Sequence, residues 1–173
     1  TGALPLEELL RWAQRISYDI EPLHTAVVWR WADSAGAPSL RRLETLVNQS
    51  VVQQGLSALV RPRGNEVVAF CAVADSGRPE AVLALAEIVR SAAADEYPAT
   101  PLFSGVGRSV SDVLEWKDAY REATQALSMA TRLHEQRSLH FGDLSVYRLL
   151  FQLEGNSELD AFCKELLGPL LEY

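Results

Sequence analysis

Apolar residues recur along the chain at two spacings, and these spacings predict its helices and strands. In residues 6–20 they return every three or four positions, which is typical of an amphipathic helix. Residues 25–32 are rich in β-branched and aromatic side chains and run into turn residues, so they are predicted as a first strand. Pro38 and Ser39 begin a second predicted helix, which ends at Gly55, where a left-handed residue is favoured.

The middle of the chain predicts a hairpin followed by a helix and a further strand. Two apolar runs, 56–60 and 67–73, flank a polar turn that contains a glycine. A helix is predicted from Pro79 through Val89, and a strand over residues 102–106. The resulting order, strand, helix, strand, strand, helix, strand, predicts an α/β chain of the α+β class. In this ferredoxin-like, split βαβ fold, an antiparallel four-stranded sheet carries both helices on one face.

The remainder of the chain is mainly helical in pattern. A helix is predicted from a cap at Ser111 or Asp112 to Leu133, and residues 138–141 form a short strand that can join the sheet. Two more amphipathic helices are predicted at 146–153 and 159–171. The predicted organisation is an N-terminal helix (1–22), a central domain (23–143) and a C-terminal helical extension (144–173).

The charge and the termini limit the function. There are 16 lysine and arginine residues against 23 acidic residues, and the net charge of -7 repels a phosphate backbone. The sequence has no signal peptide and no apolar run long enough for a membrane helix, so we expect a cytoplasmic protein that does not bind DNA by itself. Thr1 at the start, and Tyr173 within a leucine-rich run at the end, lead us to expect a fragment of a longer protein.

Four motifs in the second half of the chain indicate a family. They are Ser-Gly-Val-Gly-Arg at 104–108, Ala-Tyr-Arg-Glu-Ala-Thr-Gln-Ala-Leu at 119–127, Phe-Gly-Asp-Leu-Ser-Val-Tyr-Arg-Leu-Leu at 141–150, and Leu-Leu-Gly-Pro-Leu-Leu-Glu-Tyr at 166–173. In these motifs the chain resembles the GGDEF-like middle domain of PucR and CdaR type bacterial transcription regulators. Residues before 104 resemble it by topology only. The resemblance implies a domain that dimerises or receives a signal, while a separate helix-turn-helix module binds DNA.

The predicted hairpin turn carries the residues that would decide catalysis. In the GGDEF nucleotide cyclases, which the domain also resembles, glycines of this turn admit the nucleotide phosphates and carboxylates hold metal ions. Here Arg63-Gly64-Asn65-Glu66-Val67 keeps one glycine and one carboxylate. Arg63 replaces the first glycine, and Asn65 replaces a metal-binding carboxylate. Asp33, near the end of the first strand, is interpreted as a turn residue. We therefore expect no enzyme activity, no metal and no cofactor.

Two other functions stay open. The domain could be a nucleotide-binding or residual cyclase-like enzyme domain that uses the space above the hairpin, or a sensor of a small metabolite. The sequence does not identify an effector, an operator or the direction of regulation.

The remaining candidate residues have structural interpretations. Gly105 and Gly107 are expected where a strand turns tightly into a helix, and Trp116, Tyr120 and Leu127 on the core-facing side of that helix. Cys71 and Cys163 are expected to be buried free thiols. Surface or capping positions are expected for the three histidines, His24, His134 and His140.

The apolar faces of the two terminal helices are candidates for a homodimer interface. A helix whose apolar face is not covered by its own chain can bury that face against a second copy. The candidate interface residues are Leu6, Leu9, Leu10, Ala13, Leu159, Phe162, Leu166 and Leu170.

Overall fold

A mixed five-stranded sheet forms the centre of the protein. β1 (Leu23–Trp31) is the middle strand and pairs antiparallel with both β3 (Glu66–Val73) and β4 (Leu102–Val110). β2 (Ala58–Arg63) pairs antiparallel with β3 at one edge, and β5 (Leu139–His140) pairs parallel with β4 at the other. The sheet order is therefore β2-β3-β1-β4-β5, and both the predicted four-strand arrangement and the added short strand are confirmed.

The structure is a computed structural model that describes residue 11 and residues 22–32, 36–73 and 79–145. The predicted N-terminal helix, Asp33 and the two C-terminal helices lie outside the described residues, as do Cys163 and all eight candidate interface residues. The proposed division at residues 22 and 143 stays a prediction.

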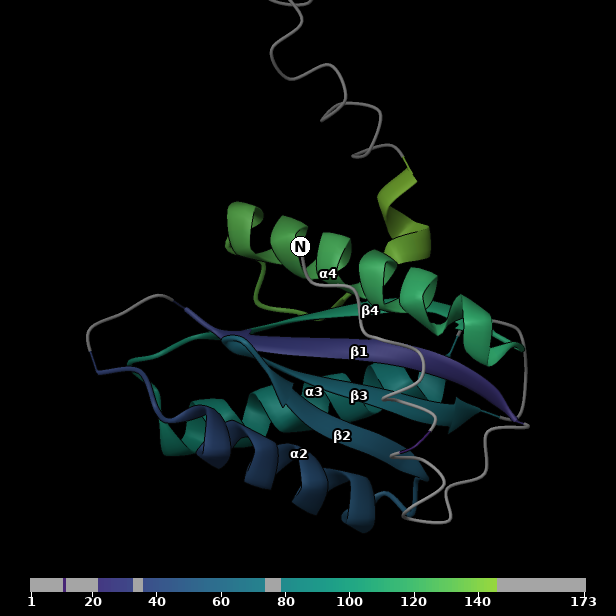
Figure 1. Ribbon diagram of the computed structural model, residues 1–173. Coiled ribbons are helices and arrows are strands. Elements are labelled where there is room, and N and C mark those ends of the chain that lie inside the picture. The colour runs from purple at the N-terminus through teal and green to yellow at the C-terminus, as the bar shows by residue number, and fades with distance from the viewer. Residues whose placement is uncertain (1–10, 12–21, 33–35, 74–78, 146–173) are drawn as a thin grey trace, which may run out of the picture. The chain divides into compact units, whose positions relative to one another are not determined.

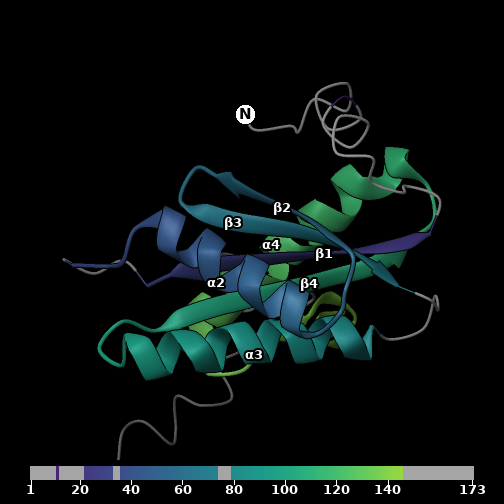
Figure 2. The same ribbon diagram turned by 90° about the horizontal axis from the view of Figure 1, so that it is seen from below.

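Helices cover the two faces of the sheet unequally. α2 (Leu40–Gln53) and α3 (Glu80–Glu96) pack together on one face, as predicted, and α4 (Trp116–Leu133) lies on the other (Figures 1 and 2). A 3₁₀ turn, η1 (Val113–Glu115), leads into α4, and another, η2 (Phe141–Leu144), follows β5. α4 packs mainly against β4 and β1.

The predicted turn chemistry accounts for the ends of these elements. The Ser39 side chain accepts a hydrogen bond from the Arg42 amide at the start of α2. The Asp112 carboxylate accepts one from the Leu114 amide, at 2.8 Å, at the start of η1. The hairpin turns at Gly64 with φ of +57°, a conformation that glycine adopts without steric cost.

The core between the sheet and α2/α3 is built from every second strand residue. Val27, Trp29 and Trp31 of β1 contribute to it, as do Val67, Ala69 and Cys71 of β3. Cys71 is a fully buried free thiol, as predicted, and burial raises its pKa to about 12. The residues that alternate with these, such as Arg30 of β1 and Glu66 of β3, face the other way, toward α4.

The predictions for the histidines are only partly right. His134 ends α4 in a left-handed conformation with φ of +49°, which confirms a capping role. His24 and His140 are buried, so a surface position is wrong for both. His140 does act as a cap, because its Nδ1 accepts a hydrogen bond from the Gly142 amide at the start of η2, at 3.2 Å. The His24 ring lies 4.5 Å from that of Trp116, because the α4 face of β1 is a second packed layer rather than an open surface.

Gly105 and Gly107 lie inside β4, and the prediction that the strand ends and turns there is wrong. β4 continues to Val110. The two glycines instead let α4 approach the sheet. A Cβ on Gly105 would lie 2.2 Å from the Ala123 carbonyl oxygen, and one on Gly107 would lie 2.4 Å from that of Ala119. Real Cβ atoms do not come this close, so the helix position requires glycine at both sites.

The buried face of α4 matches this close approach. Ala119, Ala123, Ala126 and Ala130 are buried, and their small side chains keep the helix axis near the strand. Trp116 and Leu127 are buried as predicted, whereas Tyr120 is half-buried at the margin. α4 and β4 therefore form one packed unit that we call the α4–β4 interlock.

The chain divides into two compact units, Thr1–Gly142 and Asp143–Tyr173. The sheet and helices α2 to α4 belong to the first unit. No helix among the described residues is long and apolar enough to cross a membrane.

We predict that Gly105→Ala destabilises the protein much more than Gly64→Ala. The first change places a methyl group against the backbone of α4, and overpacking of this kind costs about 3 kcal/mol or more. At Gly64 the added methyl meets no atom, and the left-handed conformation alone costs about 1 kcal/mol. Urea unfolding of both variants measures the difference. Equal losses would contradict the close approach of α4.

Candidate functional site

The degenerate hairpin motif lies beside the C-terminal end of β1. Trp29 pairs with Val67 across the two antiparallel strands, which places Arg30 next to Glu66 on the α4 face. Gly64 and Asn65 form the turn between β2 and β3. The sequence motif and the end of the first strand are thus brought together, as the cyclase resemblance implies.

The Glu66 carboxylate is occupied by two donors. Arg30 Nη1 donates to Glu66 Oε1 at 3.2 Å, and the Tyr120 hydroxyl donates to Oε2 at 3.4 Å. The Glu66 side chain is 9% exposed and that of Arg30 is 24% exposed. A carboxylate buried to this degree requires a compensating charge, and Arg30 supplies it.

Two more residues complete the group. Arg30 Nη2 donates to Thr131 Oγ1 at 3.4 Å, which ties β1 to the last turn of α4. The Arg63 guanidinium lies over the Tyr120 ring, 5.0 Å from its centroid, in a cation–π arrangement. We call these five residues, Arg30, Arg63, Glu66, Tyr120 and Thr131, the Arg30–Glu66 cluster.

The surroundings of the cluster raise the pKa of Tyr120. Burial raises the pKa of the Tyr120 hydroxyl, and the nearby negative charge of Glu66 raises it further. Tyr120 therefore stays protonated, as a donor to Glu66, at any physiological pH.

A small cavity opens at the same corner of the fold, where the end of β1 meets the hairpin turn. Its volume is about 180 Å³, and Arg30, Trp31, Asn65, Pro38 and Leu40 are among its lining residues. It thus lies between the end of β1, the hairpin turn and the start of α2. Pockets for drug-sized ligands occupy about 300 to 1,000 Å³, so this one is too small for a nucleoside triphosphate.

Metal binding at this corner would need ligands that the described residues do not supply together. Glu66 is the one carboxylate of the hairpin motif, Asn65 offers only an amide, and Arg63 is a cation. Within the parts of the chain that the structure describes, no three His, Cys, Asp or Glu residues gather as a metal site would require. A divalent cation at Glu66 would also have to displace Arg30.

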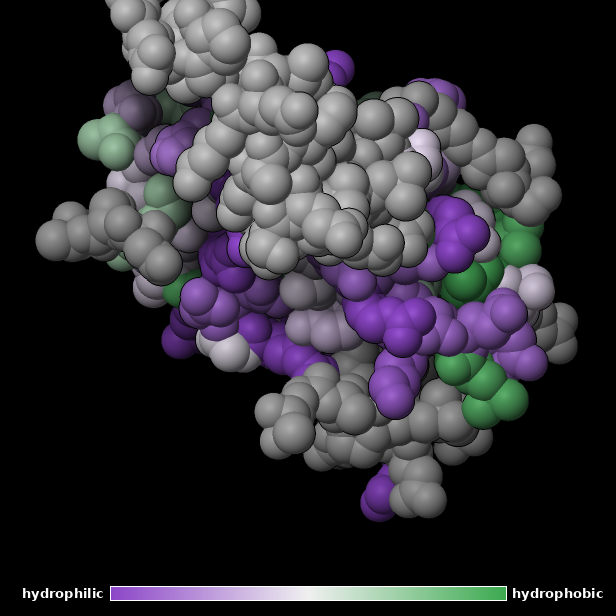
Figure 3. Space-filling model, turned by 90° about the horizontal axis from the view of Figure 1, so that it is seen from above, coloured by the Kyte–Doolittle hydropathy of each residue, from purple (hydrophilic) through white to green (hydrophobic). Residues whose placement is uncertain are grey.

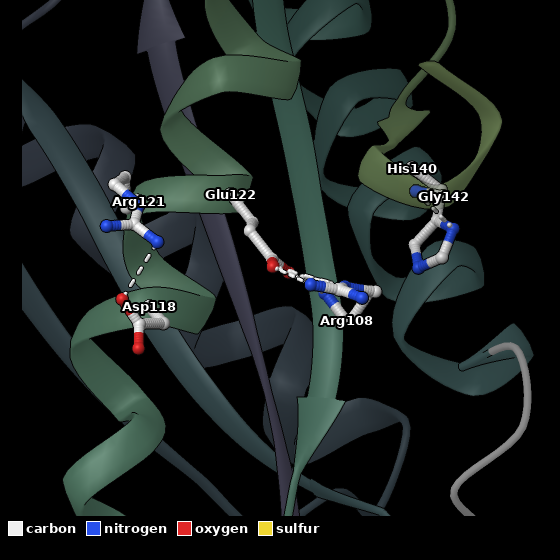
Figure 4. Close-up of polar contacts among 6 residues, drawn as sticks. All are labelled: Arg108, Asp118, Arg121, Glu122, His140 and Gly142. Carbon is white, nitrogen blue, oxygen red and sulfur yellow. Dashed lines mark hydrogen bonds and ion pairs between the residues drawn. The ribbon is translucent and has the colours of Figure 1, made fainter. Parts of the chain in front are cut away.

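A second ion pair joins two of the family-like motifs (Figure 4). Arg108 of β4 donates from its backbone N–H to Glu122 Oε2 at 3.2 Å, and its Nε lies 3.1 Å from both carboxylate oxygens. Arg108 Nη2 also contacts Glu122 Oε1. The Glu122 side chain is 8% exposed, whereas that of Arg108 is 64% exposed, and the hydrogen bonds that Arg108 donates to Glu122 raise the pKa of Arg108. This pair strengthens the α4–β4 interlock.

The outer face of α4 is polar. Asp118 and Arg121 form an exposed ion pair at 2.9 Å on this face (Figure 4). The space-filling view from this side shows that the described residues that are not covered are largely hydrophilic (Figure 3).

The sequence located the motif but not the partner of its carboxylate. Arg63, Gly64, Asn65 and Glu66 lie together, as predicted, and Asp33 lies outside the described residues. The pairing of Glu66 with Arg30 was missed. Two signals could have revealed it. The alternation along β1 puts Arg30 on the same face as Val28, and the pairing register of β1 with β3 puts Arg30 beside Glu66.

We predict that Arg30 and Glu66 are strongly coupled in a double-mutant cycle. Arg30→Met leaves a buried carboxylate without its cation and should cost about 2 to 4 kcal/mol, while adding Glu66→Gln should recover part of that loss. The exposed pair Asp118 and Arg121 is the matched control, with an expected coupling below about 0.5 kcal/mol. Urea unfolding at pH 7 measures both. Equal coupling in the two cycles would contradict the role given to Arg30.

The sequence matches a family model over more than half of its length. That model describes the GGDEF-like domain, and the match covers residues 1–129, more than half of the chain. No curated protein matches the chain. The matched stretch includes the central strand, the hairpin with its altered motif, and most of α4. The chain belongs to the family of GGDEF-like domains.

Proposed function

We propose that the protein is a non-catalytic regulatory and dimerisation domain of a PucR/CdaR-type bacterial transcription regulator in the cytoplasm. One observation carries the non-catalytic part: the remaining carboxylate of the hairpin motif is bound by Arg30 and Tyr120. A cyclase would need that corner of the fold open to metal ions and a triphosphate.

The surroundings of Glu66 support this proposal. Arg63 stacks on Tyr120 where the cyclase motif has a glycine, so its side chain occupies space beside the turn. The neighbouring cavity, at about 180 Å³, is smaller than a nucleotide requires. Both features favour a domain that acts by contact between proteins over one that acts by chemistry.

The regulatory part rests on the four motifs of the second half of the chain. In the regulators that these motifs resemble, DNA is bound by a separate helix-turn-helix module. The net charge of -7 agrees with such a division of labour, because this domain would repel DNA on its own.

A small-metabolite sensor is the second candidate, and the same cavity favours it. Arg30 and Asn65 both line the cavity and can offer hydrogen bonds to a ligand of a few heavy atoms. Such a sensor would still be non-catalytic. The nucleotide-binding alternative requires a larger site than the one observed.

We predict that calorimetry with GTP and magnesium shows no binding tighter than about 1 mM, since the corner lacks both ligands and space. The double variant Arg63→Gly with Asn65→Asp, which restores the missing glycine and the missing carboxylate, is the informative comparison. It should also fail to bind, because Arg30 still holds Glu66. Micromolar binding, or any cyclic product, by the unmodified chain would overturn the proposal.

We predict a homodimer in light scattering at tens of micromolar, with twice the chain mass of 19.1 kDa. An interface of standard size holds at this concentration. Leu166→Glu places a charge on the apolar face of the helix predicted at 159–171 and should produce monomers. Val52→Glu, at a position 77% exposed on α2, is the control and should leave the dimer intact. A monomer for the unmodified chain would remove dimerisation from the proposed role.

A further inference from the structure

One strip of the sheet is buried although the described helices cover it only in part. Leu59 of β2 pairs with Phe70 of β3, and Val68 follows on the same face of β3. That face is the α4 side, because Phe70 stacks on Trp116 with ring centroids 4.7 Å apart. Leu59 is only 1% exposed, and Val68 and Phe70 are 3% exposed. We call these three residues the β2–β3 strip.

α4 covers this strip only at its margin. The helix packs against β4 and β1, and its side chains Trp116 and Tyr120 extend toward β3. Among the described elements, the helices that pack against β2 lie on the opposite face. The burial of Leu59, on the edge strand, therefore requires a further apolar segment next to α4.

We propose that residues 6–20 form a helix of the same chain that packs on the β2–β3 strip beside α4. The sequence gives this segment one apolar stripe and one charged face. Arg11, which belongs to the charged face, is the one residue of the segment that the structure describes, and it is helical and exposed. An outward charged face turns the apolar stripe toward the protein.

The dimensions fit. A helix of this length spans about 22 Å at 1.5 Å per residue. β3, with eight residues, spans about 26 Å at 3.3 Å per residue. One helix can therefore cover the strip along most of its length.

The path of the chain favours this segment over the C-terminal one. β1 begins at Leu23, which pairs with Val73 at the end of β3. Only residues 21 and 22 thus separate the segment from a position next to β3. β5, the last strand before the C-terminal segment, is instead at the other edge of the sheet, about 14 Å from β3 at 4.8 Å per strand.

Packing of residues 6–20 on the strip does not depend on the proposed regulatory role. It does reduce the number of residues that remain available for the proposed dimer interface. Leu6, Leu9, Leu10 and Ala13 would pack on their own sheet. Contact between two copies would then fall to the apolar positions of the C-terminal helices.

Photo-crosslinking of the full chain tests the proposal. Arg61 is exposed and pairs with Val68, so p-benzoylphenylalanine in its place borders the strip without entering the core. We expect crosslinks to residues 6–20 within one chain, found by mass spectrometry. The same probe at Val52, on the opposite face of the sheet, is the control and should not reach that segment. Equal mixtures of ¹⁴N- and ¹⁵N-labelled chains identify crosslinks between two copies.

Every other result would overturn the proposal. Crosslinks of mixed isotope mass would mean that a second copy covers the strip, and crosslinks to residues 146–173 would mean that the C-terminal segment covers it. A crosslinking yield no higher than that at Val52 would mean that no helix packs on the strip. Failure of the dimer prediction would be seen separately in light scattering.

A second measurement avoids the unnatural residue. Leu59→Ala and Leu10→Ala, alone and together, form a double-mutant cycle in urea unfolding. Direct contact predicts a coupling of at least about threefold in the unfolding equilibrium constant. Leu10→Ala with Val52→Ala is the matched cycle, with a coupling factor near one. Equal factors in both cycles would count against the contact.

Discussion

The close approach of α4 to β4 is the constraint on which the arrangement of the site depends. Because Gly105 and Gly107 have no side chains, the helix backbone lies almost against the strand. That position brings Tyr120 to Glu66 and Thr131 to Arg30 across the central strand. The same approach lets the buried Glu122 accept both the backbone amide and the guanidinium of Arg108. Two of the four motifs that suggested a family, at 104–108 and 119–127, are therefore motifs of packing, and the second contains Tyr120, a donor to Glu66.

Much of the fold could be predicted because its signals are local. The alternation of β1, the turn at Gly64 and the cap at Ser39 each depend on a few neighbouring residues. The length of β4 could not be predicted, because glycines usually end strands and their role here depends on a helix that comes later in the chain. The burial of His24 and the pairing of Arg30 with Glu66 also depend on tertiary packing. Of the candidate site, the altered motif and its missing ligands could be predicted from residues 63–67 alone, but the pairing of Glu66 with Arg30 could not.

Arg30 gives the buried Glu66 carboxylate a positive partner from within the chain itself. A buried carboxylate is costly without a positive charge, and in a metal enzyme a divalent cation can supply that charge. Here a guanidinium from the neighbouring strand supplies it permanently, with a protonated tyrosine as second donor. A buried ion pair of this kind need not add much stability compared with an apolar pair, but removing one partner is costly. In our account the corner is therefore fixed in a closed state, which suits a domain whose output is contact with other proteins.

Manganese titration followed by nuclear magnetic resonance tests this closed state most directly. Mn²⁺ broadens the signals of nuclei close to it and needs no nucleotide in order to bind a carboxylate site. The account predicts that the amide signals of Gly64, Asn65 and Glu66 lose no more intensity at substoichiometric Mn²⁺ than those of the exposed acidic residues Asp118 and Glu115. Selective broadening at the hairpin turn would mean that Glu66 binds a metal in spite of Arg30, and would contradict the central claim.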